Sequence, residues 1–336
     1  MAVPKFVRQQ HHERLVLHET ERKDHRQDFL EAVGEGLASL PKQIPPMFFY
    51  DERGSELFEQ ITKTPEYYPT RTEAMILERN AADIIRNAGQ ELGLVELGSG
   101  SSSKTRLLLD VLTERQGRLR YTPIDISPTI VVEHGTKLLD DYPELHVNAL
   151  ICDYHQALQV LSEPQQEPRL FIFLGSSICN FGPKEAAALL REIGVAMGRA
   201  DRLLLGMDLR KDVAVLEAAY NDAQGVTAAF NLNLLTHINR ELGGNFDPSH
   251  FRHLAFFNDQ ESRIEMHLES QQSQLVHIDA LQRSFTFLDG ETIHTENSYK
   301  HDQSSLDALY EKTGLRRVGR WMDERSWFTL DLLSMG

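Results

Sequence analysis

Cysteine is scarce in this chain, because only Cys152 and Cys179 occur among its 336 residues. Both lie in apolar stretches, so we expect small core residues rather than a disulfide framework, which fits a reducing compartment. Long apolar runs are also missing. No segment approaches the roughly 18 apolar residues that span a bilayer, and the N-terminus has no apolar signal core. We therefore expect a soluble, cytoplasmic protein without a membrane partner.

Positive charge is in deficit as well. The chain has 35 Lys and Arg against 50 Asp and Glu, a net charge of −15. Nucleic acids and anionic membranes bind basic patches, so this balance argues against both as partners, whereas it suits a cationic ligand. The length is sufficient for one large domain or two modest ones.

The first 27 residues are charged and contain four histidines, at positions 11, 12, 18 and 25. No cysteine or paired carboxylate accompanies them to complete a metal-ligand set, so a metal site is disfavoured here and we expect none elsewhere. We expect a solvated, partly disordered N-terminal arm.

A glycine-containing loop offers the clearest sign of a ligand site. The apolar run Leu92 to Leu97 stops at Gly98-Ser99-Gly100, and a helical pattern begins close to Lys104. Glycines allow close backbone approach to a ligand, and a helix N-terminus favours anions. The third glycine of a dinucleotide fingerprint is replaced by Ser103, and a phosphate-loop ending is missing, so a simple tight turn remains an alternative. The next strand ends on Asp125, where doubly wound folds bind a ribose.

Strand and helix patterns alternate from Glu91 to Asp208, which predicts a parallel sheet with right-handed crossovers. Ligands bind outside the carboxyl ends of such strands. A helix over 304–313 and a strand near 326–333 should complete this sheet at its edge. The residues at the predicted strand ends are Gly98, Asp125, Asp153, Gly175 to Asn180, and Asp208.

The remaining segments predict a second lobe. Helices are expected over 28–40 and within 210–240, and alternating stretches predict antiparallel strands at 263–269, 274–278 and 285–288. The polar segment 291–300 is expected to reach back over the sheet. The domains predicted are the arm 1–27, a lobe of 28–71 plus 209–300, and a lobe of 72–208 plus 301–336.

Three tyrosines near the start of the second lobe could line a pocket or pack in the core. Tyr50, Tyr67 and Tyr68 stand beside acidic residues and prolines. Tyrosines in such surroundings often present a hydroxyl to a pocket, but core packing explains the spacing equally well.

The chain resembles the L-histidine Nα-methyltransferases of ergothioneine biosynthesis, from about Leu40 to the C-terminus. Seven separated motifs carry the resemblance in order and spacing: Phe49 to Asp51, Glu66 to Glu73, Glu96 to Thr105, Pro123 to Ser127, Gly175 to Phe181, Asp208 to Asp212, and Glu296 to Ser298.

The resemblance implies an α/β fold with a Rossmann-like class I S-adenosylmethionine-dependent methyltransferase domain and a second, discontinuous α+β substrate-binding domain. It implies an enzyme that trimethylates the α-amino group of L-histidine to hercynine, the first step of ergothioneine biosynthesis. We expect the protein to be a monomer. Its implied cofactor residues are Gly98, Lys104, Asp125, Asp153 and Tyr154. Its implied substrate residues are Tyr67, Gly175, Asn180, Tyr220, Phe230, Met266, Glu296 and Ser298.

Within this family pattern, Asn180 and Tyr220 would hold the carboxylate and amine end of the amino acid, and Glu296 and Ser298 would address its imidazole. Tyr50 would be the catalytic proton acceptor or relay, because an ammonium must lose a proton before it attacks. Bulk water is an alternative acceptor at mildly alkaline pH.

Each assignment has a plainer alternative. Asn180 is placed for a helix cap, and the aspartates at strand ends for loop caps. Tyr220 and Phe230 have a spacing that suits core packing. Glu296 and Ser298 alone would suggest a solvated loop.

The sequence leaves two other functions open and disfavours a third. One is methylation of another aromatic amino acid such as tryptophan, and another is S-adenosylmethionine binding without catalysis. A nucleic-acid methyltransferase is disfavoured by the charge.

Overall fold

The chain divides into two units, which we call unit 1 and unit 2. The computed structural model describes residues 6–20, 25–100, 102–163 and 167–336. Unit 1 comprises the described part of Met1–Arg22 together with Thr72–Leu209 and His301–Gly336. Unit 2 comprises the described part of Lys23–Arg71 together with Arg210–Lys300. The second unit is therefore discontinuous in sequence.

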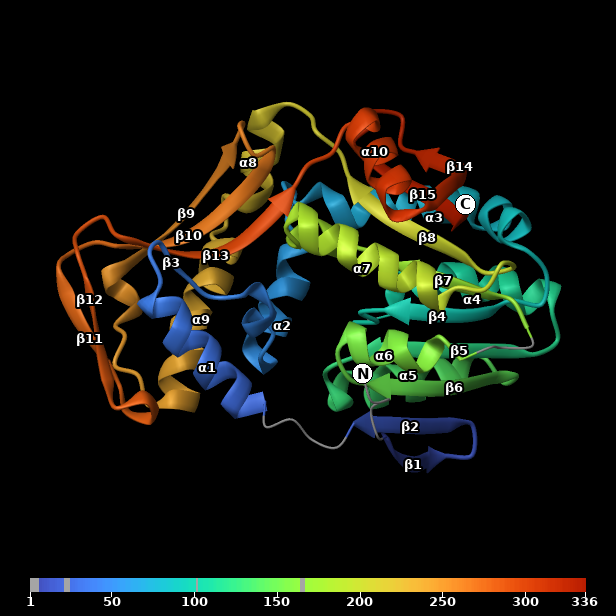
Figure 1. The fold of residues 1–336 in the computed structure, drawn as a ribbon, viewed down its shortest axis with the longest axis horizontal. Coiled ribbons are helices and arrows are strands. Elements are labelled where there is room, and N and C mark those ends of the chain that lie inside the picture. The colour runs from blue at the N-terminus through green and yellow to red at the C-terminus, as the bar shows by residue number, and fades with distance from the viewer. Residues whose placement is uncertain (1–5, 21–24, 101, 164–166) are drawn as a thin grey trace. The chain divides into compact units, whose positions relative to one another are not determined.

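Unit 1 is built on a nine-stranded sheet with the order β1-β2-β6-β5-β4-β7-β8-β15-β14 (Figure 1). Its strands are β1 (Phe6–His12), β2 (Leu15–Thr20), β4 (Gly93–Leu97), β5 (Leu119–Asp125), β6 (Leu145–Ile151), β7 (Arg169–Phe173), β8 (Arg202–Asp208), β14 (Leu315–Met322) and β15 (Phe328–Met335). Its helices are α4 (Ser103–Arg115), α5 (Pro128–Asp141), α6 (Tyr154–Leu161), α7 (Pro183–Ala196), α10 (Gln303–Thr313), the short η2 (Ser177–Asn180), and α3 (Tyr68–Ala88) from Thr72 onward.

The central strands are parallel, as the alternating pattern predicts. All five residues of β4 and all five of β7 are buried, which explains why both strands are apolar except for Glu96 and Arg169. The order of the strands reverses at β4, which lies between β5 and β7. A reversal of this kind opens a crevice at the carboxyl ends of the strands, so Gly98, Asp125 and Gly175 fall where ligands bind in such sheets. Cys152 and Cys179 are buried and lie outside any disulfide, as expected for small core residues.

The late edge strands differ from the prediction of a wholly parallel sheet. β15 runs antiparallel to β8, and β14 runs antiparallel to β15. Only five residues, 323–327, separate β14 from β15. A connection this short joins antiparallel neighbours, since a parallel pair requires a crossover of a dozen residues or more. Strand β14 itself was not predicted from the sequence.

The expectation of a solvated N-terminal arm is wrong for residues 6–20. β1 and β2 form a hairpin, and β2 pairs in parallel with β6. Leu15 is fully buried and packs against α5, where a Cβ added to Gly135 would lie 3.5 and 3.6 Å from its two terminal methyl groups. Three consecutive apolar residues, Leu15 to Leu17, therefore belong to the core. Residues 1–5 and 21–24 of the expected arm lie outside the described residues.

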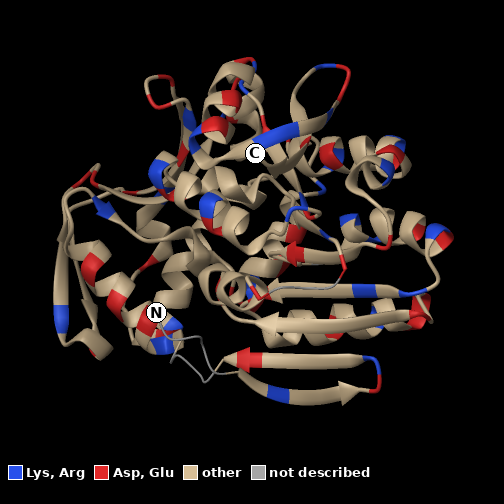
Figure 2. Cartoon of the chain, turned by 45° about the vertical axis from the view of Figure 1, so that its right-hand side comes forward, with Lys and Arg blue, Asp and Glu red and all other residues tan. Residues whose placement is uncertain are grey.

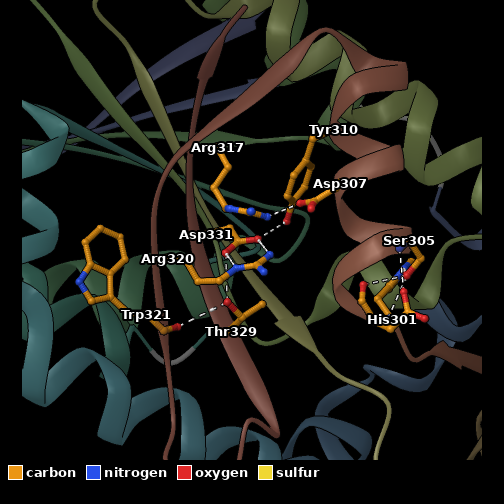
Figure 3. Close-up of polar contacts among 10 residues, drawn as sticks. His301, Ser305, Asp307, Tyr310, Arg317, Arg320, Trp321, Thr329 and Asp331 are labelled. Atoms are coloured by element: carbon orange, nitrogen blue, oxygen red, sulfur yellow. Dashed lines mark hydrogen bonds and ion pairs between the residues drawn. The ribbon is translucent and has the colours of Figure 1, made fainter.

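A buried ionic network ties the antiparallel edge to the last helix (Figure 3). Asp331 of β15 is fully buried and accepts two hydrogen bonds from Arg320 of β14, both at 2.6 Å. Its carboxylate also accepts from Tyr310 of α10 at 2.8 Å and from Thr329 at 3.0 Å. These donors compensate a charge whose burial alone is costly, so they fix the register of the edge strands.

Unit 2 contains a four-stranded sheet and a separate two-stranded ribbon. The sheet order is β3-β13-β10-β9, and the ribbon pairs β11 with β12. The strands are β3 (Lys42–Gln43), β9 (Phe251–Asn258), β10 (Arg263–Ser270), β11 (Gln274–Ile278), β12 (Arg283–Phe287) and β13 (Thr292–Tyr299). The helices are α1 (His25–Ala38), α2 (Glu52–Ile61), α8 (Val213–Tyr220), α9 (Val226–Leu242) and the short η1 (Pro46–Phe49), η3 (Pro248–His250) and η4 (Asp279–Leu281).

The polar segment 291–300 contains a strand of this sheet, β13, which the sequence pattern did not predict. β13 pairs antiparallel with β10, and three of its five buried residues, Thr295, Glu296 and Ser298, are polar. Burial of polar residues conceals a strand from hydrophobic periodicity, which explains why this strand was not predicted.

Charges are distributed over both units. Acidic and basic positions are interspersed along the helices and strands (Figure 2). Among the described residues, no helix is both long and apolar enough to cross a membrane.

The buried position of Leu15 predicts that the hairpin stabilises unit 1. Leu15→Ala should lower the free energy of unfolding by about 2 to 4 kcal/mol, because it removes buried methyl groups and leaves a cavity. Val7→Ala on β1 is the control, since Val7 is 49% exposed and should change stability by less than about 0.5 kcal/mol. Urea unfolding measures both changes. Equal, small effects would contradict the placement of β2 in the sheet.

Candidate active site

The glycine loop of unit 1 has a backbone that requires glycine. Gly98 has φ +72°, and a Cβ there would lie 2.7 Å from the hydroxyl oxygen of Tyr154. Gly100 has φ +42°, and a Cβ there would meet no other described heavy atom within 4 Å. The loop is thus closed against Tyr154 at one glycine and open at the other. The described residues therefore leave the backbone at Gly100 accessible to a ligand.

A buried carboxylate, Glu96, lies at the root of this loop. Thr105 of α4 donates its hydroxyl to the carboxylate at 2.7 Å from each oxygen, and the Tyr121 hydroxyl of β5 also donates to it. Burial raises the pKa of Glu96 to about 7, against the opposing effect of these hydrogen bonds. Glu96 was not among the predicted site residues. An acidic residue inside an apolar strand was the available signal.

Asp125 lies against the same loop. Its carboxylate accepts from the backbone N–H of Gly100 at 3.2 Å and of Ser127 at 3.0 Å, and burial raises its pKa. The acid predicted to bind a ribose therefore also orders the loop. Asp153 caps α6 by accepting from the N–H of Gln156 at 2.9 Å, which is the plainer role weighed for it.

A second buried carboxylate joins Lys104 to the Gly175 turn. Glu73 of α3 is fully buried, and its two oxygens accept from the N–H of Gly175 at 2.9 and 2.8 Å. Lys104 forms an ion pair with the same carboxylate. Gly175 has φ +76°, and a Cβ there would be 3.3 Å from the Lys104 Nζ atom. Lys104 thus has a structural partner, and Glu73, which sequence reasoning missed, links α4 to the turn that follows β7.

Asn180 does not cap the following helix. It is the last residue of η2, whereas the N-cap of α7 is Gly182. The helix-cap alternative is therefore wrong, and the half-buried amide of Asn180 makes no hydrogen bond to the described residues.

In unit 2, β13 presents three polar residues on one face. Glu296, Ser298 and Lys300 alternate along the strand and its end, and they are 9%, 4% and 3% exposed. Met266 of β10 is the register partner of Glu296. Burial raises the pKa of Glu296 to about 7, and the positive charge of Lys300 opposes this rise. The solvated-loop alternative for Glu296 and Ser298 is therefore wrong.

Five aromatic rings of unit 2 form a cluster. Tyr50 contacts Phe58 and Phe230 edge-on, with centroids 5.6 and 5.8 Å apart. Phe58 continues to Tyr67 at 6.2 Å, and Tyr67 continues to Tyr220 at 6.4 Å. Phe230 is 3% exposed whereas Tyr50 is 43% exposed, so the cluster runs from the core to the surface of the unit. Phe58 was missed as a candidate because apolar spacing assigned it to the core.

Tyr68 belongs to a different environment from the cluster. It is buried, and its hydroxyl accepts from the Lys211 Nζ atom at 2.6 Å. This contact favours a structural role for Tyr68.

One group in unit 2 has the residue types of a metal site. Ligand atoms of Glu265, His267 and His294 lie within 4.8 Å of one another. The Glu265 carboxylate, however, already accepts from Asn258, Arg263 and His267, at 2.8, 2.8 and 3.0 Å. These contacts lower the pKa of Glu265 to about 2 despite its burial. The carboxylate is thus accounted for without an ion.

Comparison with known proteins agrees with these features. The model of a family described as histidine-specific, S-adenosylmethionine-dependent methyltransferases matches residues 29–335. The chain belongs to this family. Its fold is accordingly the α/β fold of class I S-adenosylmethionine-dependent methyltransferases, with a mixed main sheet and a second unit carrying a smaller sheet.

Individual relatives cover most of the chain. It is 43% identical to the histidine N-alpha-methyltransferase of Mycolicibacterium smegmatis, over 89% of this chain and 92% of the relative. It is 30% identical to ergothioneine biosynthesis protein 1 of Neurospora crassa, over 84% of this chain and 32% of that longer protein. It is 26% identical to a 4-dimethylallyltryptophan N-methyltransferase of Claviceps purpurea, over 90% of this chain and 94% of the relative.

S-adenosylmethionine is the methyl donor of this family, and the residues of unit 1 fit it. The open space at Gly100 and the buried Asp125 carboxylate stand at the reversal of the strand order, where a nucleoside binds in such sheets. Gly98, Lys104, Asp125, Asp153 and Tyr154 therefore stay our predicted cofactor residues.

Glu96 makes the stability of unit 1 depend on pH. Its pKa is about 7 in the folded chain and about 4.5 when exposed. Because the folded value is the higher one, the stabilisation is fully present below pH 4.5 and is lost as pH rises through 7. Relative to Glu96→Gln, the wild type should lose up to about 3 kcal/mol of unfolding free energy between pH 4.5 and 8.

Urea unfolding of both proteins at pH 5 and pH 8 measures this difference. The Gln variant serves as the reference for every other titrating group, including Glu296. Parallel stability profiles for the two proteins would contradict the assignment.

Proposed function

We propose that this chain transfers three methyl groups from S-adenosylmethionine to the α-amino nitrogen of L-histidine. The product would be hercynine, and the reaction would be the first step of ergothioneine biosynthesis. The names of the relatives from M. smegmatis and N. crassa support both the substrate and the pathway. The observation that carries the proposal is the buried Glu296 and Ser298 pair on β13.

The polar pair suits a neutral imidazole. The ring has one N–H donor and one nitrogen acceptor. The Glu296 carboxylate accepts hydrogen bonds only, so it is matched to the N–H, and the Ser298 hydroxyl can donate to the other nitrogen. A ligand without these atoms would leave buried polar groups unpaired, which is a strong basis for discrimination.

The aromatic cluster suits the amino group at each stage of methylation. S-adenosylmethionine supplies a methyl group bound to a positively charged sulfur. The amine must first lose a proton, and its lone pair then forms the new N–C bond as the C–S bond breaks. Tyr50, whose hydroxyl-bearing ring is partly exposed, is our proposed proton acceptor or relay. The ring faces of Tyr50, Tyr67 and Phe230 would stabilise the cationic product.

The remaining predicted contacts are part of the proposal. Tyr220 and Asn180 would bind the carboxylate and amine end, Gly175 would provide a close backbone approach, and Met266 would line the imidazole pocket. We propose a cytoplasmic monomer, because buried cysteines outside any disulfide suit a reducing compartment and one chain carries every residue named.

The alternative substrate is a tryptophan derivative, as the name of the C. purpurea relative indicates for that protein. An indole has one N–H donor and no nitrogen acceptor. It would pair with Glu296 but leave Ser298 without a partner on the ring. The presence of both residues on β13 therefore favours histidine.

The substrate assignment predicts methylation of histidine above other amino acids. Purified protein is incubated with S-adenosylmethionine and one amino acid at a time, and product masses are read. We expect mono-, di- and trimethylated histidine, with the trimethylated form accumulating. Methylation of tryptophan but not histidine would transfer the assignment to the alternative. If no amino acid gains a methyl group, the proposed activity is wrong.

Glu296→Gln should weaken the use of histidine far more than binding of the methyl donor. Loss of a charged hydrogen-bond acceptor costs about 1.5 to 3 kcal/mol, so kcat/KM for histidine should fall about 10- to 150-fold. The dissociation constant of S-adenosylmethionine, measured by calorimetry, should change less than about twofold.

Glu269→Gln is the matched control for this variant. Glu269 lies on the neighbouring β10 and pairs with Arg252, away from the proposed contacts. Equal losses of histidine use and donor binding in Glu296→Gln would refute the imidazole role.

A further inference from the structure

Lys300 is a buried cation at the end of β13, and both its backbone N–H and its backbone carbonyl are hydrogen-bonded. Its N–H donates to the Ser262 carbonyl at 2.7 Å, and its own carbonyl accepts from the Ser262 hydroxyl at 2.7 Å. Only 3% of the residue is exposed. The side chain is therefore held inside unit 2, where burial of an ammonium is unfavourable unless it serves paired groups.

The ammonium contacts two residues that we propose for the substrate. The Lys300 Nζ atom donates to the Ser298 hydroxyl at 2.7 Å and to the Tyr220 hydroxyl at 3.3 Å. It also lies 5.2 Å from the centroid of the Tyr220 ring. Its charge acts on Glu296 as well, which it helps to keep ionised. One side chain thus reaches the imidazole pair and the tyrosine assigned to the carboxylate.

The direction of these hydrogen bonds has a chemical consequence. An ammonium has three protons and no acceptor lone pair, so neither hydroxyl can donate to it. Each hydroxyl accepts a hydrogen bond from Lys300 through one of its oxygen lone pairs, so its own proton must point away from Lys300. Ser298 and Tyr220 are thereby set as donors, the polarity required by an imidazole nitrogen lone pair and by a carboxylate.

We propose that Lys300 is a positioning residue of the histidine site, which orients the hydroxyls of Ser298 and Tyr220 as hydrogen-bond donors to the amino acid. This inference rests on the proposed function and adds a residue that neither the motifs nor the spacing singled out. In its absence Ser298 can turn its proton away from the ring. The site then loses its preference for a ring with an acceptor nitrogen.

A neutral replacement separates positioning from packing. Lys300→Met keeps the length and apolar stem of the side chain but removes the donors. We expect KM for histidine to rise about tenfold or more, as for a lost charge-assisted hydrogen bond. The dissociation constant of S-adenosylmethionine should change less than about twofold.

Lys42→Met is the matched control. Lys42 is a second buried lysine of unit 2, but it pairs with Glu291 and lies over the ring of Phe287. This variant should lower the thermal unfolding midpoint and leave KM for histidine unchanged. A rise in KM of the same size in Lys42→Met would show that loss of any buried lysine disturbs the site, and would overturn the proposal.

A double-mutant cycle with Ser298→Ala tests whether Lys300 acts through Ser298. If it does, the double variant should have nearly the KM of the worse single variant, because the shared interaction is lost only once. Multiplied effects, or an unchanged KM in Lys300→Met, would overturn the proposal. Lys300→Gln, which keeps an N–H donor without the charge, replaces Lys300→Met in the cycle if the latter does not fold.

A substrate analogue gives a second readout that a structural role would not move. β-(2-Thienyl)alanine has a five-membered ring without nitrogen. The wild type should prefer histidine strongly, and Lys300→Met should reduce this preference by about tenfold. An equal loss with both substrates would refute positioning.

The wild-type arm separates this inference from the proposed function. If the wild type methylates another amino acid instead of histidine, the proposed function fails, and the cycle run with that amino acid still decides the role of Lys300. If the wild type methylates none, both proposals fail.

Discussion

The buried carboxylate of Glu96 is the constraint on which the methyl-donor half of the structure depends. It accepts hydrogen bonds from the hydroxyls of Thr105 in α4, which follows the glycine loop, and of Tyr121 in β5, the strand beside β4. A loop with two glycines at positive φ has high conformational freedom, so its shape must be fixed from outside. Glu96 holds the beginning of α4 through its hydrogen bond with Thr105, and Asp125 holds the loop by accepting from the N–H of Gly100. The loop is therefore preorganised by two carboxylates rather than by its own sequence.

The sequence predicts the parts of the fold that follow hydrophobic pattern. The apolar runs of β4 and β7, the alternation of strands and helices, and the helix of α10 are all found as expected. The hydrophobic pattern does not predict a strand or helix whose buried residues are polar. β13 buries Thr295, Glu296 and Ser298, so its alternation cannot be recognised. The N-terminal hairpin was not predicted for a related reason, since only the apolar residues Leu15 to Leu17 distinguish its sequence from that of a charged arm.

Site residues are predictable in type but not in partnership. Gly98, Asp125 and Gly175 lie at strand ends because the topology places them there. No local signal indicated that Glu73 would pair with Lys104, since 31 positions separate them and tertiary packing alone brings them together. The aromatic cluster was likewise not predictable from local sequence. Tyr50 follows η1 and Phe230 belongs to α9, so tertiary packing alone brings their rings together.

Successive methylation explains why the buried polar residues are assigned to the imidazole. Each methyl group removes an N–H donor from the amine, and the final product has a fixed positive charge and no donor. Hydrogen bonds donated by the amine are lost as methyl groups are added, whereas aromatic faces attract the cation at every stage. Discrimination among amino acids must then come from a part of the substrate that does not change. The imidazole is that part, and the buried polar face of β13 offers an acceptor in Glu296 and a hydroxyl in Ser298.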